Sequence, residues 1–173
     1  MYTILMPVDE SEERAVAQSE TVLDLPAEAD QVLVYLLHVS DTALQSNDVS
    51  IDDTPGGEIA YERLTDAGVA VETLLRGGDP AETIIESAEQ VSADMILLGG
   101  RKRSPLGSLL FGSVSQAVTL DAKQPVTITG NAEQIDPPSH RCHNCGRKYY
   151  LEPAREIASC NKCGGAKVEA LTQ

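Results

Sequence analysis

The chain has 173 residues, of which 42% are hydrophobic, and a formal net charge of −14 at pH 7. This apolar content excludes wholesale disorder, and the longest apolar runs are too short to span a bilayer. The charge is uneven: residues 1–139 hold seven bases and 24 acids, a net of −17, whereas residues 140–173 carry +3. Such a negative field opposes non-specific binding of the larger part to nucleic acid or anionic membranes.

Apolar runs alternate with amphipathic segments over residues 1–130. The runs predict β-strands at residues 2–9, 31–40, 69–75, 94–99 and 124–129. The segments between them predict helices at residues 12–25, 60–67, 80–91 and 110–121. Ser11 and Asp79 are placed to cap two of these helices, and Gly68 is placed to end another. Residues 41–57 are polar and end in two glycines, so we expect a mobile loop there.

Strands that alternate with helices form parallel βαβ units with right-handed crossovers. The sequence therefore predicts an α/β fold, a three-layer doubly wound parallel sheet of five strands. Residues 131–139 are polar and contain two adjacent prolines, which predicts a linker. We expect one domain at residues 1–130 and a small second domain at residues 140–173.

Two features of the sequence bear on where the protein acts and on whether it is an enzyme. The amino terminus, MYTILMPVDE, shows no basic leader, so we expect a soluble, cytoplasmic protein, whose acid excess also suits a high-salt cytoplasm. The chain contains no Walker A sequence, no G-x-G-x-x-G, no G-x-S-x-G and no H-E-x-x-H. We therefore expect no enzyme, with a slow ATPase as the alternative.

The segment at residues 99–115, GGRKRSPLGSLLFGSVS, follows the fourth predicted strand and leads into the last helix. In open α/β sheets, ligands bind beyond the carboxyl ends of the strands, and small residues let backbone amides approach a phosphate. Three of the seven bases in residues 1–139 lie here: Arg101, Lys102 and Arg103. This basic cluster predicts a polyanion site; a solvated basic turn or a subunit ion pair is the alternative.

Residues 1–130 resemble the universal stress protein family. The family pattern is G-x-x-G, nine residues and then G-[S/T]; here Gly99 opens it, Lys102 stands in place of its second glycine, and Gly112-Ser113 close it. The sequence ILMPVDES is similar to the family's first strand, LLHVS to its second, and GSVSQAVTLDAKQPVTI to its last helix and strand. The resemblance implies an adenine nucleotide alpha hydrolase-like fold and a stress-response protein.

The resemblance also implies an adenine nucleotide ligand, ATP or a relative. Adenine and ribose would lie near Pro7, Val8 and Asp9, and the base would be flanked by Val39. The phosphates would lie against Gly99, Arg101, Lys102, Gly112, Ser113, Val114 and Ser115. From the residues alone, Asp9 and Ser113 could equally be helix caps, and Val39 could be plain core. Because the family includes members without nucleotide, the alternative is a scaffold whose site is closed by Lys102.

A homodimer, paired through the last strand, is a further implication of the resemblance. An edge strand exposes unpaired backbone groups, which a second copy of the chain would cover. Residues 124–130, QPVTITG, suit such an edge, since a proline near the start of a strand is compatible with an edge position.

All four cysteines lie in residues 140–173, in two C-x-x-C pairs separated by fourteen residues. This spacing is typical of a four-cysteine zinc ribbon, and the predicted ligands are Cys142, Cys145, Cys160 and Cys163. A segment this short cannot bury enough core alone, which also favours a structural metal. Iron is the rival metal and a redox dithiol pair the other alternative. We expect His140 and His143 to lie outside the ligand set.

We interpret the ribbon as a docking module for a protein partner or for a second copy of the chain. Its charge of +3 and the sequence RKYY at residues 147–150 leave nucleic acid as an alternative, because basic and aromatic side chains together bind single strands. The charge of −17 on residues 1–139 disfavours that alternative. No membrane partner is expected.

Overall fold

The computed structural model describes residues 1–40, 50–51, 54–100, 112–129, 139–149, 157–160 and 162–171. The chain divides into two units, Met1–Glu133 and Gln134–Gln173. Two of the residues predicted to border a phosphate, Arg101 and Lys102, lie outside the described residues, as does most of the expected linker.

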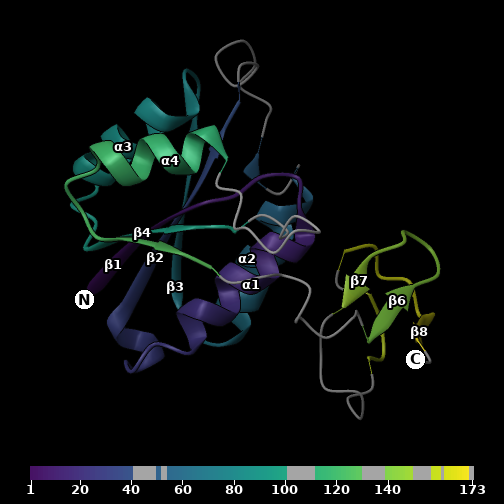
Figure 1. The fold of residues 1–173 in the computed structure, drawn as a ribbon. Helices are drawn as coiled ribbons and strands as arrows, with labels where there is room; N and C mark the ends of the chain where they lie inside the picture. The colour runs from purple at the N-terminus through teal and green to yellow at the C-terminus, as the bar shows by residue number, and fades with distance from the viewer. Residues whose placement is uncertain are drawn as a thin grey trace, which may run out of the picture. The chain divides into compact units, whose positions relative to one another are not determined.

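The first unit is built around a parallel sheet of five strands in the order β3-β2-β1-β4-β5 (Figure 1). The strands are β1 at Tyr2–Pro7, β2 at Val32–Val39, β3 at Ala70–Arg76, β4 at Met95–Leu98 and β5 at Val126–Ile128. The first three strands add in one direction, and the chain then crosses back to place β4 on the other side of β1. This order confirms the α/β, doubly wound fold predicted from the sequence.

Helices cover both faces of the sheet, so the unit has the three predicted layers (Figure 1). One face carries α1 at Glu12–Leu23 and α2 at Pro55–Asp66, and the other carries α3 at Pro80–Gln90 and α4 at Ser113–Asp121. A short 3-10 turn, η1, spans Ala29–Gln31.

Local hydrogen bonds explain where the helices begin. The hydroxyl of Ser11 accepts from the Arg14 amide at 3.3 Å, and Asp79 accepts from two first-turn amides of α3 at 2.9 and 3.1 Å. Each bond satisfies an amide that has no partner within its helix and contributes about 1 kcal/mol to stability. Helix α4 differs, because its N-cap is Gly112, so Ser113 is the first helical residue and not the cap.

Strand β1 is buried on both faces of the sheet, as its unbroken apolar sequence predicts. Ile4, Leu5 and Met6 are all fully buried. On the side of α3 and α4, Leu5 belongs to a core cluster with Leu37, Ile84, Ala88, Ala93, Ile96, Leu98 and Val118. Burial of one such side chain contributes about 1.5–3 kcal/mol, so the sheet is held mainly from its centre.

The predicted end of the 41–57 loop is wrong. Gly56 and Gly57 lie in the first turn of α2, which begins at Pro55. Packing requires a glycine there, because a Cβ on Gly56 would lie 2.1 Å from the carbonyl oxygen of Asp9. Paired glycines usually favour a loop, but local propensity is a weak preference that tertiary contact overrides. The rest of that expected loop lies mostly outside the described residues.

The second unit contains a three-stranded antiparallel sheet in the order β7-β6-β8. The strands are β6 at His140–Cys142, β7 at Lys148–Tyr149 and β8 at Val168–Ala170. Its core among the described residues is small: three buried side chains with two half-buried ones against them, namely Cys142, Tyr149, Cys160, Ile157 and Val168. An apolar cluster of this size does not offset the conformational entropy lost on folding.

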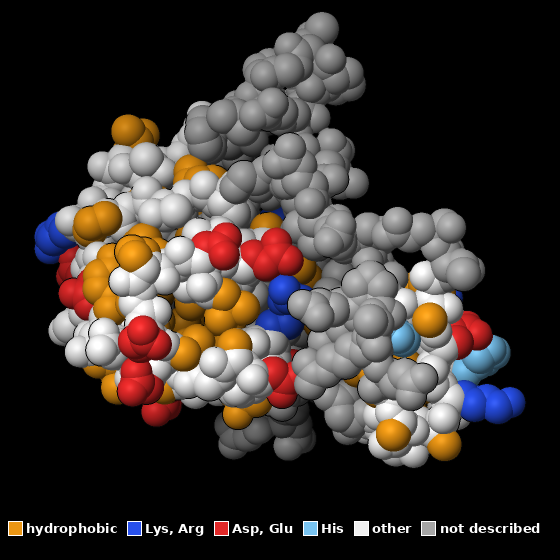
Figure 2. All heavy atoms as spheres, turned by 90° about the horizontal axis from the view of Figure 1, so that it is seen from below, with side chains coloured by type: hydrophobic (Ala, Val, Ile, Leu, Met, Phe, Trp, Pro, Cys, Tyr) orange, Lys and Arg blue, Asp and Glu red, His pale blue; other side chains and the backbone are white. Residues whose placement is uncertain are grey.

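Figure 2 shows one face of the first unit, on which acidic side chains outnumber lysine and arginine. This surface agrees with the charge of −17 that the sequence assigns to residues 1–139. Within the described ranges, no helix has both the length and the apolar character needed to cross a membrane.

Candidate functional site

A pocket opens at the carboxyl ends of β1, β2 and β4, where the strand order reverses. Connections that leave neighbouring parallel strands in opposite directions create a crevice at this edge of a sheet. The pocket encloses about 260 Å³, close to the lower end, about 300 Å³, of pockets that hold small ligands. The described residues that line it are Pro7, Val8, Asp9, Arg14, Gln18, Leu37, His38, Val39, Pro80, Ile84, Leu98, Gly99, Gly112, Val114 and Ser115.

Most of the residues predicted for a nucleotide site line this one pocket: Pro7, Val8, Asp9, Val39, Gly99, Gly112, Val114 and Ser115. They come from the ends of three strands and from the first turn of α4. The exception among the described residues is Ser113, which starts α4 without lining the pocket. Arg101 and Lys102 lie beyond the described ranges.

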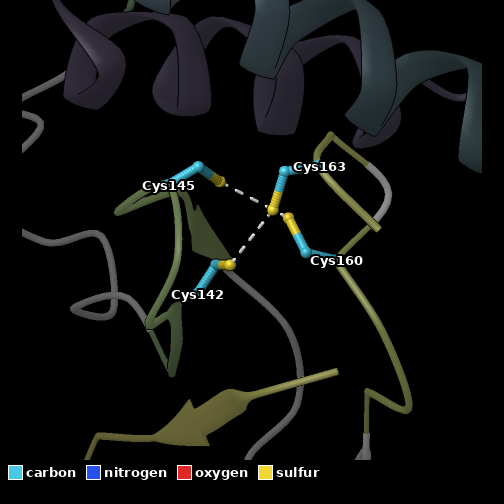
Figure 3. Close-up of side chains that lie close together, drawn as sticks. All are labelled: Cys142, Cys145, Cys160 and Cys163. Atoms are coloured by element: carbon cyan, nitrogen blue, oxygen red, sulfur yellow. Dashed lines mark hydrogen bonds between the residues drawn. The ribbon is translucent and has the colours of Figure 1, made fainter. Parts of the chain in front are cut away.

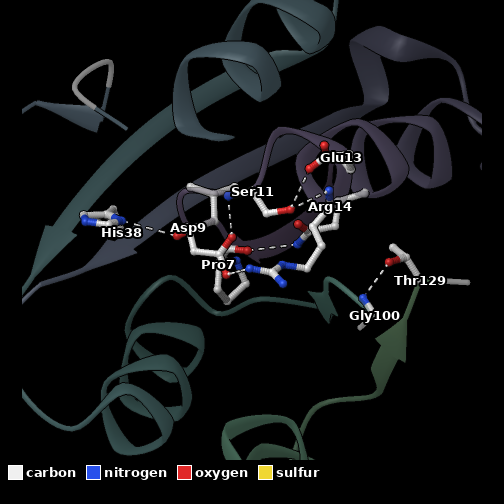
Figure 4. A network of polar contacts seen from close by, with 10 residues as sticks. Pro7, Asp9, Ser11, Glu13, Arg14, His38, Gly100 and Thr129 are labelled. Atoms are coloured by element: carbon white, nitrogen blue, oxygen red, sulfur yellow. Dashed lines mark hydrogen bonds and ion pairs between the residues drawn. The ribbon is translucent and has the colours of Figure 1, made fainter. Parts of the chain in front are cut away.

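The polar end of the pocket is organised around Asp9, which follows β1 (Figure 4). One carboxylate oxygen accepts from the Ser11 amide at 2.9 Å, and the other pairs with the guanidinium of Arg14 on α1. Asp9 is therefore not the N-cap of α1, a role that Ser11 fills. On the opposite side of the loop, the His38 Nδ1 atom lies 3.3 Å from the Val8 carbonyl oxygen.

Gln18 fixes the two strands that flank the crevice. Its side chain is 2% exposed, and its amide group donates to the carbonyl oxygens of Pro7 and Leu97, each at 2.9 Å. A Cβ on Gly99 would lie 3.0 Å from the Gln18 Oε1 atom and 3.1 Å from the Arg14 Cβ and Cδ atoms. Gly99 therefore lets α1 approach the end of β4 closely, so the same glycine shapes both the strand end and the position of Arg14.

Sequence reasoning missed seven of the described lining residues, among them the three with polar side chains, Arg14, Gln18 and His38. A signal for two of them exists, because Arg14 and Gln18 lie one helical turn apart on α1, five and nine residues after Asp9. Gln18 also interrupts the apolar face of an otherwise amphipathic helix. A polar side chain at such a position is typical of a buried hydrogen-bonding role.

The four cysteines of the second unit come together (Figure 3). Their sulfur atoms all lie within 4.8 Å of one another, with Cys142 and Cys163 at 3.7 Å and Cys145 and Cys160 at 3.6 Å. Four thiolate donors at mutual distances of this size match a tetrahedral metal site of zinc or iron. Among the described residues of the second unit, these four cysteines could therefore hold one metal ion.

Each C-x-x-C pair is turned by its own glycine. Gly146 and Gly164 have φ of +76° and +67°, and their amides donate to the carbonyl oxygens of Cys142 and Cys160 at 3.0 and 2.8 Å. Backbone with φ in this range is readily adopted only by glycine. The glycines therefore close two similar turns that carry the sulfur atoms inward.

Side chains around the cluster donate to two of the sulfur atoms. The Tyr149 hydroxyl donates to Cys160 Sγ at 3.0 Å, and the Asn144 amide donates to Cys163 Sγ at 3.4 Å. His140 is buried beside Ser139, and His143 lies 3.4 Å from Glu169. Neither histidine belongs to the cluster of candidate ligands found among the described residues.

The crowded thiols ionise unequally. Burial raises the pKa of Cys160, but hydrogen bonds from Tyr149 and from the backbone outweigh it and lower the pKa to about 6. A backbone amide lowers the pKa of Cys145, but desolvation and the three neighbouring thiols raise it to about 12. Cys160 therefore ionises readily, whereas Cys145 resists ionisation because neighbouring thiolates repel its negative charge. A divalent cation removes that repulsion.

Comparison with known proteins agrees with the fold. The model of the universal stress protein family matches residues 1–130. The chain belongs to the universal stress protein family. Among its relatives, the stress response protein NhaX of Bacillus subtilis is 33% identical over 125 residues, a match that covers 64% of this chain and 72% of NhaX.

Solved structures of the family show the same fold. A universal stress protein from Archaeoglobus fulgidus is 30% identical, with a TM-score of 0.56, over 75% of this chain and 99% of that one. A structure of the universal stress protein from the same organism in complex with dAMP is 26% identical, with a TM-score of 0.51, over 75% of this chain and 98% of that one. Both alignments leave out about a quarter of this chain.

Proposed function

We propose that this universal stress protein binds an adenine nucleotide, ATP or a relative, in the pocket at the carboxyl ends of β1, β2 and β4, and acts as a stress-response regulator. One observation carries the proposal: residues far apart in sequence and expected to surround a nucleotide line a single pocket at the point where strand order reverses. A relative that is 26% identical was solved with dAMP, which supports an adenine nucleotide as the ligand.

The proposed ligand has a different neighbour at each end. The base lies against Val39 and the ribose near Asp9, whose side chain is 55% exposed and can still accept from a hydroxyl group. The phosphates lie against the start of α4, Gly112 to Ser115, where unpaired amides and the helix dipole favour an anion. Arg101 and Lys102 add positive charge to the same phosphates, in a part of the chain that otherwise repels anions.

Isothermal titration calorimetry with ATP and AMP tests the proposal, with Asp9→Asn as the variant. We expect saturable binding to the native chain and a loss of about tenfold in Asp9→Asn, because a charge-assisted hydrogen bond contributes about 1.5 kcal/mol or more. Asp94→Asn is the matched control: its carboxylate also accepts from a backbone amide, that of Thr3 at 2.8 Å, but at the amino end of β4. Absence of binding to the native chain would refute the proposal.

For the second unit we propose one structural zinc ion, bound by Cys142, Cys145, Cys160 and Cys163. The donor set fits, since four sulfur atoms converge within 4.8 Å and the surrounding core is too small to fold without a cross-link. When bound, the metal would hold the two C-x-x-C turns together. Elemental analysis of freshly purified, reduced protein should give about one zinc per chain. Iron in place of zinc would correct the metal, and no metal at all would refute the site.

We also propose that the chain forms a homodimer through β5, which lies at an edge of the sheet. The Thr129 amide donates to the Leu98 carbonyl oxygen at 2.9 Å, so the preceding amide, that of Ile128, points away from β4. Ile128→Pro should therefore convert a dimer into a monomer in native mass spectrometry, and Ile128→Val, which keeps the amide, should not. A monomeric native chain would contradict this proposal.

A second candidate function is a scaffold that binds no nucleotide and docks a protein partner through the zinc ribbon. Lys102 favours this candidate, because it occupies the position of the second glycine in the family pattern. The two functions differ in one result. Nucleotide binding to the native chain supports the regulator, and a zinc-bearing dimer that binds no nucleotide supports the scaffold.

A further inference from the structure

Arg14 is the one lysine or arginine among the described residues that line the pocket. Its position is unusual, because residues 1–139 contain only seven bases against 24 acids. A basic side chain inside a pocket of so acidic a chain costs little electrostatically, and it offsets the negative charge of Asp9 in the same lining.

Two contacts hold the Arg14 side chain in place, and a third fixes its partner Asp9. Asp9 pairs with its Nη2 atom, and the other oxygen of Asp9 is fixed by the Ser11 amide at 2.9 Å (Figure 4). The aliphatic part of the side chain lies across Gly99, where a Cβ would meet the Arg14 Cβ and Cδ atoms at 3.1 Å. The side chain is 28% exposed, so most of it is already ordered before any ligand arrives. An ordered arginine loses little entropy when it binds.

The chemistry of this group selects an anion. A guanidinium carries five N–H donors in a rigid plane, so a carboxylate at one edge leaves other donors free to bind a phosphate at another. A neutral nucleoside offers hydroxyl groups but no such acceptor. The Arg14 guanidinium can therefore contribute to the binding of a phosphate independently of any contact between the pocket and the base.

We propose that Arg14 determines specificity in this pocket by binding a phosphate group, so that the pocket prefers a nucleoside 5′-phosphate to the nucleoside. Asp9 acts on the same choice as a positioning residue, because it holds the guanidinium, and Gly99 leaves the space that the arginine stem occupies. This inference rests on the proposed nucleotide-binding function.

Calorimetry with two probes, AMP and adenosine, tests the inference. In Arg14→Gln we expect the ratio of AMP affinity to adenosine affinity to fall by about 10- to 100-fold, the size of one or two charge-assisted hydrogen bonds. Arg14→Lys, which keeps the charge and loses the planar donors, should recover part of that ratio. Arg63→Gln is the matched control, since Arg63 on α2 also pairs with a carboxylate, that of Glu20 at 3.2 Å, but does not line the pocket.

The outcomes separate the inference from the function on which it rests. If Arg14→Gln weakens AMP and adenosine by the same factor, or changes neither, Arg14 does not bind phosphate and the proposed nucleotide function stands. If Arg63→Gln lowers the ratio as much as Arg14→Gln does, the effect is a general one and the assignment is wrong. If the native chain binds neither AMP, adenosine nor ATP, the nucleotide function fails and this inference fails with it.

Discussion

The first unit buries an unbroken apolar strand between two helical layers, whereas the described core of the second consists of one tyrosine and two cysteines with two half-buried neighbours. Burial alone can hold the first unit together, so its pocket can bind and release a ligand without loss of the fold. With so small a core, the second unit would need the proposed metal to fold. The same chain would therefore use one ligand as a signal and the other as a structural cross-link, and the following experiments test that division.

The largest expected effect comes from the double variant Cys142→Ser/Cys160→Ser. Apparent binding free energies of structural zinc are about 10–16 kcal/mol, so its loss should unfold the second unit completely. In ¹H–¹⁵N spectra, the amide resonances of the second unit should move to the chemical shifts of an unfolded chain, while those of the first unit stay dispersed. His143→Ala, beside the cluster but outside the candidate ligand set, should leave both sets unchanged. A dispersed second unit in the double variant would show that its core suffices.

Leu5→Ala should produce the opposite result. The side chain is fully buried at the centre of the sheet, and removing it should lower the free energy of unfolding of the first unit by about 2–5 kcal/mol. Zinc content should not change. Leu120→Ala, at a position that is 82% exposed, is the control and should change stability by less than about 0.5 kcal/mol in urea unfolding. Equal effects at the two positions would contradict burial as the source of stability.

Gly56→Ala should affect the pocket through the backbone. Its Cβ would overlap the carbonyl oxygen of Asp9, so the loop that carries Asp9 must move, at a cost of about 1–3 kcal/mol in stability. Affinity for AMP should fall as well. Gly57→Ala is matched to it: the added Cβ would instead meet the Ile51 carbonyl oxygen at 2.4 Å, so it should destabilise without an equal loss of affinity. Identical affinity losses would exclude a specific link to Asp9.

Tyr149→Phe should weaken the second unit by about 1 kcal/mol, because it removes the hydroxyl that donates to Cys160 Sγ. The expected signature is faster transfer of zinc to a coloured chelator and a shift of the sulfur-to-metal absorption band after cobalt substitution. Tyr61→Phe, on α2 in the first unit, should alter neither. An unshifted cobalt band would show that the hydroxyl does not act on the sulfur.

Lys102→Gly should give the smallest effect. If the lysine adds a cation near the phosphates, its loss should weaken ATP binding by about 0.2–1 kcal/mol, the size of an exposed ion pair. The scaffold alternative predicts the reverse, since restoring the family glycine would then create or improve binding. Calorimetry against ATP decides between the two signs.

Much of the first unit could be predicted because its local and global signals agree. The alternation of apolar runs with helical patterns fixed the strand count and the layers, and Ser11 and Asp79 marked two helix starts correctly. The pocket residues at strand ends followed from the family pattern. The spacing of Arg14 and Gln18 indicated a shared face of α1, but packing decides that this face meets the end of β4 and borders the pocket. The glycines at the start of α2 were misassigned for the same reason.

The spacing of the four cysteines was enough to predict that they lie close together, without any information about the rest of the core. The hydroxyl group that donates to Cys160 Sγ could not be predicted, because the adjacent tyrosines at positions 149 and 150 are two candidates and no local signal separates them. A two-residue strand, β7, determines that Tyr149 points into the core. Strands this short carry no periodicity that a sequence pattern could use.

The placement of β1 at the middle of the sheet has a consequence for synthesis of the chain. Its first partner, β2, leaves the ribosome soon after it, but its second partner, β4, follows only after some ninety residues, and the start of α4 later still. One of the two edges of β1 therefore stays unpaired while translation proceeds at about 5–20 residues per second. For several seconds each nascent chain exposes an apolar strand edge, so early recruitment of a chaperone should raise the yield of the first unit more than that of the second.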